Sequence, residues 1–199
     1  MNIKKLISVL FVVVSTNSIA QSEIRFGTKA GVNLTGFHTG KSANTDNVLF
    51  NIGGLAELNI SELFSVQAEL LYNRKGGLFL IRNTGVSQFF TIDTKLDYID
   101  LPIQAKFEFI KNLSLDIGPQ IGFLINSKGE IVNSQNDNGE EVEFTNTNTV
   151  DFALNGGLSF KFSDSLFLQA RYSYGLTEIF ENERYKNSVV SLSLGYFFK

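Results

Sequence analysis

The sequence predicts an all-β protein: an eight-stranded antiparallel up-and-down transmembrane β-barrel, preceded by a cleaved signal peptide. Three observations predict this fold: apolar and polar residues alternate along eight segments, long and short connections alternate between them, and aromatic residues gather at their ends. Because successive side chains on a strand point to opposite faces, each segment has one apolar and one polar face. No segment shows a convincing helical period.

The first twenty residues have the three parts of a secretory signal peptide. A basic start (Met1 to Lys5) precedes an apolar run (Leu6 to Val14), and Ser18-Ile19-Ala20 is a cleavage site of small residues. The apolar run is too short to span a bilayer as a helix. We expect cleavage after Ala20, so that 1–20 is the signal peptide and 21–199 is one outer-membrane β-barrel domain. A buried N-terminal strand or helix is the alternative.

Composition narrows the class of protein. The 199 residues suit one domain, and the net charge of -3 argues against nucleic acid as a partner. The chain contains no Cys, so it has neither disulfides nor a lipid attachment residue near the cleavage site.

The segment from Leu96 to Phe109 shows the strand pattern most clearly. From Ile99 onward its odd positions are apolar, and its even positions are Asp100, Pro102, Gln104, Lys106 and Glu108. A tilted membrane-spanning strand needs about 9–11 residues, which this pattern supplies. Pro102 has no N–H to give to a neighbouring strand, so we expect a local bulge or a gap in the ladder there.

Seven further segments repeat the pattern. They cover roughly residues 25–35, 48–59, 64–75, 113–125, 149–162, 166–174 and 188–198. The connections near 36–47, 76–94, 126–148 and 177–187 are long, whereas those near 60–63, 110–112 and 163–165 are short. Within the second long connection, Leu78 to Ile81 and Phe89 to Ile92 are apolar enough to extend one hairpin beyond the bilayer.

The alternation of connections indicates that the apolar face meets lipid, because outer-membrane barrels have long external loops and short periplasmic turns. A lipocalin-like soluble barrel would turn this face into the lumen, where Phe side chains from nearly every strand would overfill an eight-stranded barrel. The aromatic residues form the two girdles expected at membrane interfaces. They are Phe26, Phe64, Phe107, Phe109, Phe160, Phe162, Tyr196 and Phe198 at the periplasmic rim, and Phe50, Tyr72, Phe123 and Tyr174 at the outer rim.

The polar face carries charges that would fill the lumen of so small a barrel. They are Lys29, Glu57, Glu69, Asp100, Lys106, Glu108, Asp116, Asp151, Lys161 and Arg171. Because unpaired buried charges are costly, we expect a structural ion-pair network rather than a proton or ion pathway. Folding the chain about Lys111 places Lys106 opposite Asp116, and we expect these two to pair.

Five segments resemble the PorT-like outer-membrane β-barrel domain proteins, a family of OmpA-like eight-stranded barrels. They are Phe26 to Leu34, Gln67 to Gly76, Tyr98 to Ile103, Arg171 to Leu176 and Leu194 to Phe198. The resemblance covers essentially the whole mature chain and implies an outer-membrane barrel of a Gram-negative envelope. The name-giving members are linked to a secretion system, but no residue here is diagnostic of that role. Phe198 also resembles the aromatic end of the sorting signal read by the barrel assembly machinery, although Lys199 follows it.

The sequence shows little that could carry catalysis or bind a cofactor. His38 has Asp46 within the same expected loop, but one such pair arises by chance in a polar loop. Asn136 to Glu141 resembles a Ca²⁺ loop without its residue spacing, which favours a solvated loop. We therefore expect no enzyme, no cofactor and no metal.

Two functions remain open at this stage. The first is a structural or interaction barrel whose external loops, chiefly 126–148, contact a protein or surface partner. The alternative is an accessory component or narrow conduit of a transport or secretion system.

Overall fold

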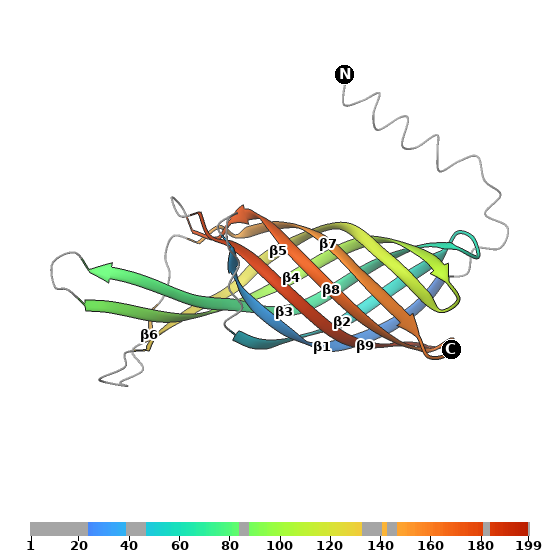
Figure 1. Ribbon diagram of the computed structural model, residues 1–199, viewed down its shortest axis with the longest axis horizontal. Helices are drawn as coiled ribbons and strands as arrows, with labels where there is room; N and C mark the ends of the chain where they lie inside the picture. Colours follow the sequence, from blue (N-terminus) through green and yellow to red (C-terminus); the bar gives the residue numbers. More distant parts are fainter. Residues whose placement is uncertain are drawn as a thin grey trace, which may run out of the picture.

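The computed structural model describes residues 24–38, 47–83, 88–132, 141–142, 147–180 and 184–198. Eight long strands close into one antiparallel barrel in which each strand pairs with its neighbours in the chain and β9 pairs with β1 (Figure 1). They are β1 (Ile24–His38), β2 (Asn47–Asn59), β3 (Phe64–Asn83), β4 (Gln88–Ile110), β5 (Leu113–Val132), β7 (Val150–Lys161), β8 (Leu166–Glu178) and β9 (Lys186–Phe197). The predicted fold is confirmed. The expected signal peptide lies outside the described residues.

Across the middle of the barrel strands, side chains alternate between the outside and the lumen. In β9, for example, Leu194 is 50% exposed while the neighbouring Ser193 is 2% exposed. The apolar face points outward, as expected for a wall in contact with lipid. In the part of the chain that the structure describes, no helix is long and apolar enough to cross a membrane.

The two ends of the barrel differ, and we call them the turn end and the loop end. The short connections lie at the turn end together with the C-terminus (Figure 1); they are residues 60–63, 111–112 and 162–165. Asn112 has a φ of 69°, a left-handed conformation that Asn tolerates better than most residues, and it allows the two-residue turn between β4 and β5. Exposed aromatic side chains surround this end, among them Phe26, Phe162 and Phe198.

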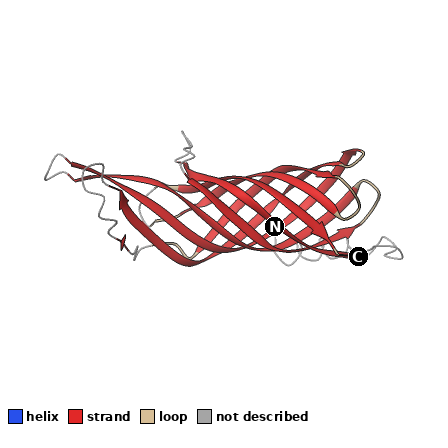
Figure 2. Cartoon of the chain, turned by 90° about the horizontal axis from the view of Figure 1, so that it is seen from below, coloured by secondary structure: helices blue, strands red, loops and turns tan. Residues whose placement is uncertain are grey.

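At the loop end, three strands continue past the rest of the barrel (Figures 1 and 2). The β2–β3 ladder stops at the pair Asn51–Asn73, but β3 and β4 remain paired to Asn83–Gln88. The expected hairpin extension is therefore confirmed. The expectation that 126–148 is entirely loop is wrong, because β5 continues beside β4 to Val132 and the short strand β6 (Glu141–Val142) pairs with it.

Pro102 interrupts the ladder without shifting its register. The β3–β4 pairing runs from Ala68–Ile103 directly to Leu71–Asp100, so the two intervening positions on each strand are skipped. The expected gap is thus present, whereas the two β4–β5 register shifts lie at Asp97–Tyr98 and Glu108–Ile110. A second gap, between Pro102–Gln120 and Ala105–Ile117, includes Pro119, which also lacks an N–H.

Candidate functional site in the barrel lumen

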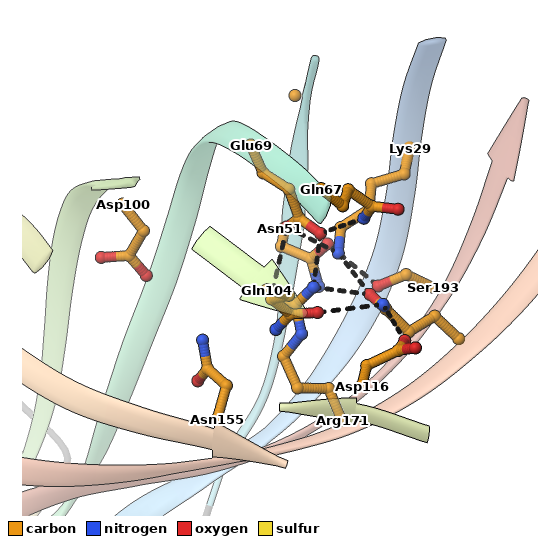
Figure 3. Close-up of polar contacts among 12 residues, drawn as sticks. Lys29, Asn51, Gln67, Glu69, Asp100, Gln104, Asp116, Asn155, Arg171 and Ser193 are labelled. Atoms are coloured by element: carbon orange, nitrogen blue, oxygen red, sulfur yellow. Dashed lines mark hydrogen bonds and ion pairs between the residues drawn. The ribbon is translucent and has the colours of Figure 1, made fainter. Parts of the chain in front are cut away.

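The turn-end half of the lumen contains a buried charge cluster centred on Glu69 of β3. Lys29 Nζ of β1 lies 2.9 Å from Glu69 Oε2, and the Arg171 guanidinium of β8 binds both carboxylate oxygens, with one N–O distance of 3.0 Å. Gln169 accepts hydrogen bonds from Lys29 and Arg171, at 2.6 and 2.7 Å. Figure 3 shows these side chains converging from different strands. Two cations therefore share one carboxylate away from water.

A second carboxylate in this half, Glu57, also binds two cations. Lys106 Nζ lies 2.9 Å from Glu57 Oε2, and Arg25 contacts Glu57 Oε1. Lys106 and Asp116 are direct neighbours in the β4–β5 register, as expected, but they do not form the expected ion pair. The reason is that Lys106 reaches across the lumen to β2, which cross-strand pairing alone does not reveal.

Asp116 is instead satisfied by neutral donors. It accepts hydrogen bonds from Ser114 at 2.9 Å, from Gln169 at 2.8 Å and from Ser159. Asp116 and the charged groups around Glu69 and Glu57 together form what we call the turn-end cluster. Its members are Arg25, Lys29, Glu57, Glu69, Lys106, Asp116 and Arg171.

In the loop-end half of the lumen carboxylates outnumber cations, whereas cations outnumber carboxylates in the turn-end cluster. Lys75 Nζ lies 3.1 Å from Asp100 and 3.0 Å from Asp151, so one cation serves two buried carboxylates. Asn73 and Gln120 donate to Asp100 Oδ2 at 2.6 and 2.8 Å. The Tyr98 ring covers the ammonium group, with its centroid 4.3 Å from Lys75 Nζ.

Sequence reasoning missed two of these cations, Arg25 and Lys75. Of the ten residues named from the sequence, eight are buried, three of them basic and five acidic, which leaves an excess of two negative charges away from water. Arg25 and Lys75 remove this excess. Both occupy inward positions of the same alternating pattern, so a charge count of the lumen face could have found them.

The remaining expected residues, Glu108 and Lys161, lie at the turn-end rim. Lys161 Nζ is 3.3 Å from Glu108 Oε2, and both side chains are about a quarter exposed, at 23% and 24%. Exposed ion pairs of this kind contribute about 0–1 kcal/mol. This pair therefore lies apart from the buried clusters.

Two clusters of apolar side chains share the lumen with the charged residues. Leu55, Phe167 and Phe197 pack together toward the turn end. At the loop end, a larger cluster contains Phe37, Ile92, Leu96, Tyr98, Ile179 and Phe180. The described side chains thus fill the lumen with buried ion pairs and two apolar clusters, of which the one at the turn end packs among the charges: Arg25 lies over the Phe197 ring at 4.3 Å and Lys106 over the Phe167 ring at 5.2 Å.

His38 lies at the end of β1, where its ring is 3% exposed and stacks on Tyr174 with a centroid distance of 4.2 Å. Its Nε2 lies 3.0 Å from the carbonyl oxygen of Gly175. These contacts give His38 a structural role in the packing at the loop end. Asp46, its expected partner, and the Ca²⁺-like segment 136–141, apart from the backbone of Glu141, lie outside the described residues.

Comparisons with known proteins agree with this architecture. A family model described as "outer membrane protein beta-barrel domain" matches residues 19–181. The solved structure of Ail, the attachment invasion locus protein of Yersinia pestis, is 16% identical with a TM-score of 0.51, covering 89% of this chain and 99% of Ail.

A second structure, of Ail with the heparin analogue sucrose octasulfate, has a TM-score of 0.52 and 16% identity, covering 88% of this chain and 99% of that one. Neisserial surface protein A is 13% identical with a TM-score of 0.49, covering 89% and 99%. For Ail, an identity this low shows a shared fold alone. No curated protein sequence matches the chain.

Proposed function

Because the chain belongs to the outer membrane protein β-barrel domain family, we propose that it is a closed outer-membrane anchor that presents an external interaction surface. The filled lumen is the observation that carries this proposal. Buried ion pairs and two apolar clusters occupy the space that a conduit would need. The buried charges then serve the stability and closure of the barrel rather than transport.

The interaction surface in this proposal is the extension of β3, β4 and β5 at the loop end. External loops of outer-membrane barrels are longer than periplasmic turns, so this end faces outward. Three strands stay paired beyond the point where the β2–β3 ladder stops, and a structural anchor alone would not require this extension. A protein or another surface would bind there.

Several finer assignments follow from the sequence and belong to the same proposal. They are membership of the PorT-like group, cleavage after Ala20, insertion by the barrel assembly machinery and the lack of catalytic activity. Mass determination of the mature N-terminus tests the cleavage site: a first residue other than Gln21 would contradict it.

Planar-bilayer recordings on refolded protein test the closed anchor. We expect no steady ohmic conductance, whereas stable single-channel steps would favour the alternative, a narrow conduit of a transport or secretion system. Glu69→Ala, which opens space at the centre of the turn-end cluster, is the comparison variant. If both proteins show the same measurable conductance, the lumen side chains around Glu69 do not block the pore.

Site-specific photocrosslinking in intact cells tests the interaction surface. A benzophenone side chain at Asn83, at the tip of the extension, should form protein adducts, and one at the lipid-facing Leu154 should not. Equal adducts from both positions, or none from Asn83, would contradict an interaction role for this end.

A further inference from the structure

A short apolar segment of the β8–β9 connection, Ile179 and Phe180, lies in the loop-end mouth of the lumen. The two side chains are 2% and 9% exposed and pack in the loop-end apolar cluster with Leu96 and Tyr98 of β4. Connections between strands usually run over the surface, so two large apolar side chains buried from a connection need an explanation. We call these two residues the latch.

The cluster that contains the latch separates the loop-end charges from water. Along the lumen face of β4, Asp100 is followed toward the loop end by Tyr98, Leu96 and Ile92, and the last three belong to the cluster. The Tyr98 ring also covers Lys75, with its centroid 4.3 Å from Nζ. Lys75 and Asp100 are both buried. Water at the loop end therefore reaches this ion pair only past the apolar cluster.

The β8–β9 ladder breaks directly before the latch. It is paired as far as Tyr174–Ser188 and resumes only at Glu178–Lys186, so residues 175–177 have no register partner on β9. Irregularities of this kind interrupt the ladder and bend the strand that contains them. The latch is thus attached to the barrel through a stretch that β9 does not hold in place.

Gly175 fixes the position of this break. A side chain there would come within 2.6 Å of the Asn187 carbonyl oxygen, so the close approach of the two backbones requires glycine. His38 Nε2 lies 3.0 Å from the Gly175 carbonyl oxygen, and the His38 ring stacks on Tyr174. Because these contacts hold the start of the break against β1, the stretch after Gly175 can act as a hinge.

Beyond the break, the described residues that hold the latch backbone belong to connections rather than to a long barrel ladder. Ile179 N donates to the Tyr185 carbonyl oxygen at 2.8 Å. Asn148 donates through N and Nδ2 to the carbonyl oxygens of Ile179 and Glu178, both at 2.8 Å. Thr147 forms an isolated bridge with the latch. Segments held in this way open locally more readily than the central strands of a sheet.

We propose that the latch is a hinged cover that seals the loop-end mouth of the lumen and opens by a local rearrangement beyond Gly175. In the closed state its apolar side chains keep water from Lys75 and its two carboxylates, which strengthens their ion pairs. In the open state water and small solutes reach the loop-end charges, while the turn-end cluster still blocks the barrel. The device adds a compartment that opens at one end, without making a conduit.

Thiol labelling tests the latch, because the chain contains no Cys and a single introduced Cys reports on its own surroundings. Ala153→Cys places a thiol on the lumen face of β7, between Asp151 and Asn155. The refolded protein in detergent is treated with a small charged methanethiosulfonate, and labelling is followed by mass. We expect slow labelling when the latch is intact. Adding Ile179→Ala and Phe180→Ala should speed it about 100-fold, since truncating large buried side chains favours the open state by about that factor.

Matched variants separate the latch from general loosening of the barrel. Phe197→Ala truncates a large buried ring in the turn-end apolar cluster and should leave labelling at Ala153→Cys unchanged. Ser193→Cys places a buried thiol opposite Gln169 in the turn-end half and should stay slow when the latch is truncated. Heat-modifiable gel migration shows that each variant is folded. Should the double truncation fail to fold, Ile179→Ala alone should speed labelling about tenfold or more.

Three results would overturn the proposal. If Ala153→Cys with an intact latch is labelled as fast as an exposed thiol at Ser61→Cys, the loop-end mouth is open and the latch seals nothing. Equal labelling rates with the intact and the truncated latch would show that other residues seal the mouth. An acceleration by Phe197→Ala as large as that by the latch truncation would show that labelling follows general loosening.

Discussion

Replacing Glu69 by Gln probes how the lumen tolerates its charges. The substitution keeps the size of the side chain but removes the only carboxylate that Lys29 and Arg171 share. Both cations are buried, at 3% and 4% exposure. Removing one partner of a buried ion pair costs about 3–5 kcal/mol, mainly because the remaining charge is left without compensation. We expect Glu69→Gln to lower the free energy of unfolding by this amount or more.

Arg171→Met is the informative comparison. Although it removes more hydrogen bonds, to Glu69 and Gln169, it leaves Lys29 and Glu69 as a neutral pair. We therefore expect it to cost at most about 2 kcal/mol. Urea titration of the refolded protein measures the free energy of unfolding of both variants. Since the chain contains no Trp, the folded fraction is followed by circular dichroism or gel migration. If Arg171→Met costs as much as Glu69→Gln, lost hydrogen bonds rather than charge balance govern this cluster.

Three further predictions use the same unfolding measurement. Gly195→Leu should cost about 1–3 kcal/mol, because a side chain there would overlap the Phe167 ring, whereas Gly156→Ala, which meets open space, should change stability by less than about 0.5 kcal/mol. Leu194→Arg should cost about 2–4 kcal/mol in the middle of the lipid-facing wall, and Phe198→Arg about 0–1 kcal/mol near the turn-end interface; equal costs would contradict a lipid-facing belt. Leu96→Ala should cost about 2–5 kcal/mol as a cavity in the loop-end apolar cluster, while Leu101→Ala, which faces outward, should cost much less.

Local pattern predicted the eight strands well because membrane and lumen impose opposite demands on alternate residues. The strand 188–198 was expected within two residues of β9, since lipid requires an apolar side chain at every second position. The same rule failed beyond Ile125. Apolar residues no longer occupy every second position in residues 126–130, so this stretch resembles a loop even though β5 stays paired with β4.

Pairing within the lumen was less predictable than strand position. Register predicted Lys106 beside Asp116, yet the ammonium reaches Glu57 on β2 and Asp116 is satisfied by Ser and Gln donors. A long side chain in a narrow barrel can reach several strands. Its choice therefore depends on the positions of all surrounding donors and acceptors.

The sequence by itself determined that this chain is a membrane-spanning barrel, which face meets lipid and which end carries the long connections. These properties follow from a period of two residues and from connection lengths, both of which are local. Only the tertiary structure decided that cations exceed carboxylates toward the turn end and that carboxylates exceed cations toward the loop end. That separation arises from contacts across the lumen between strands distant in the chain, such as Lys29 with Glu69 and Lys75 with Asp151.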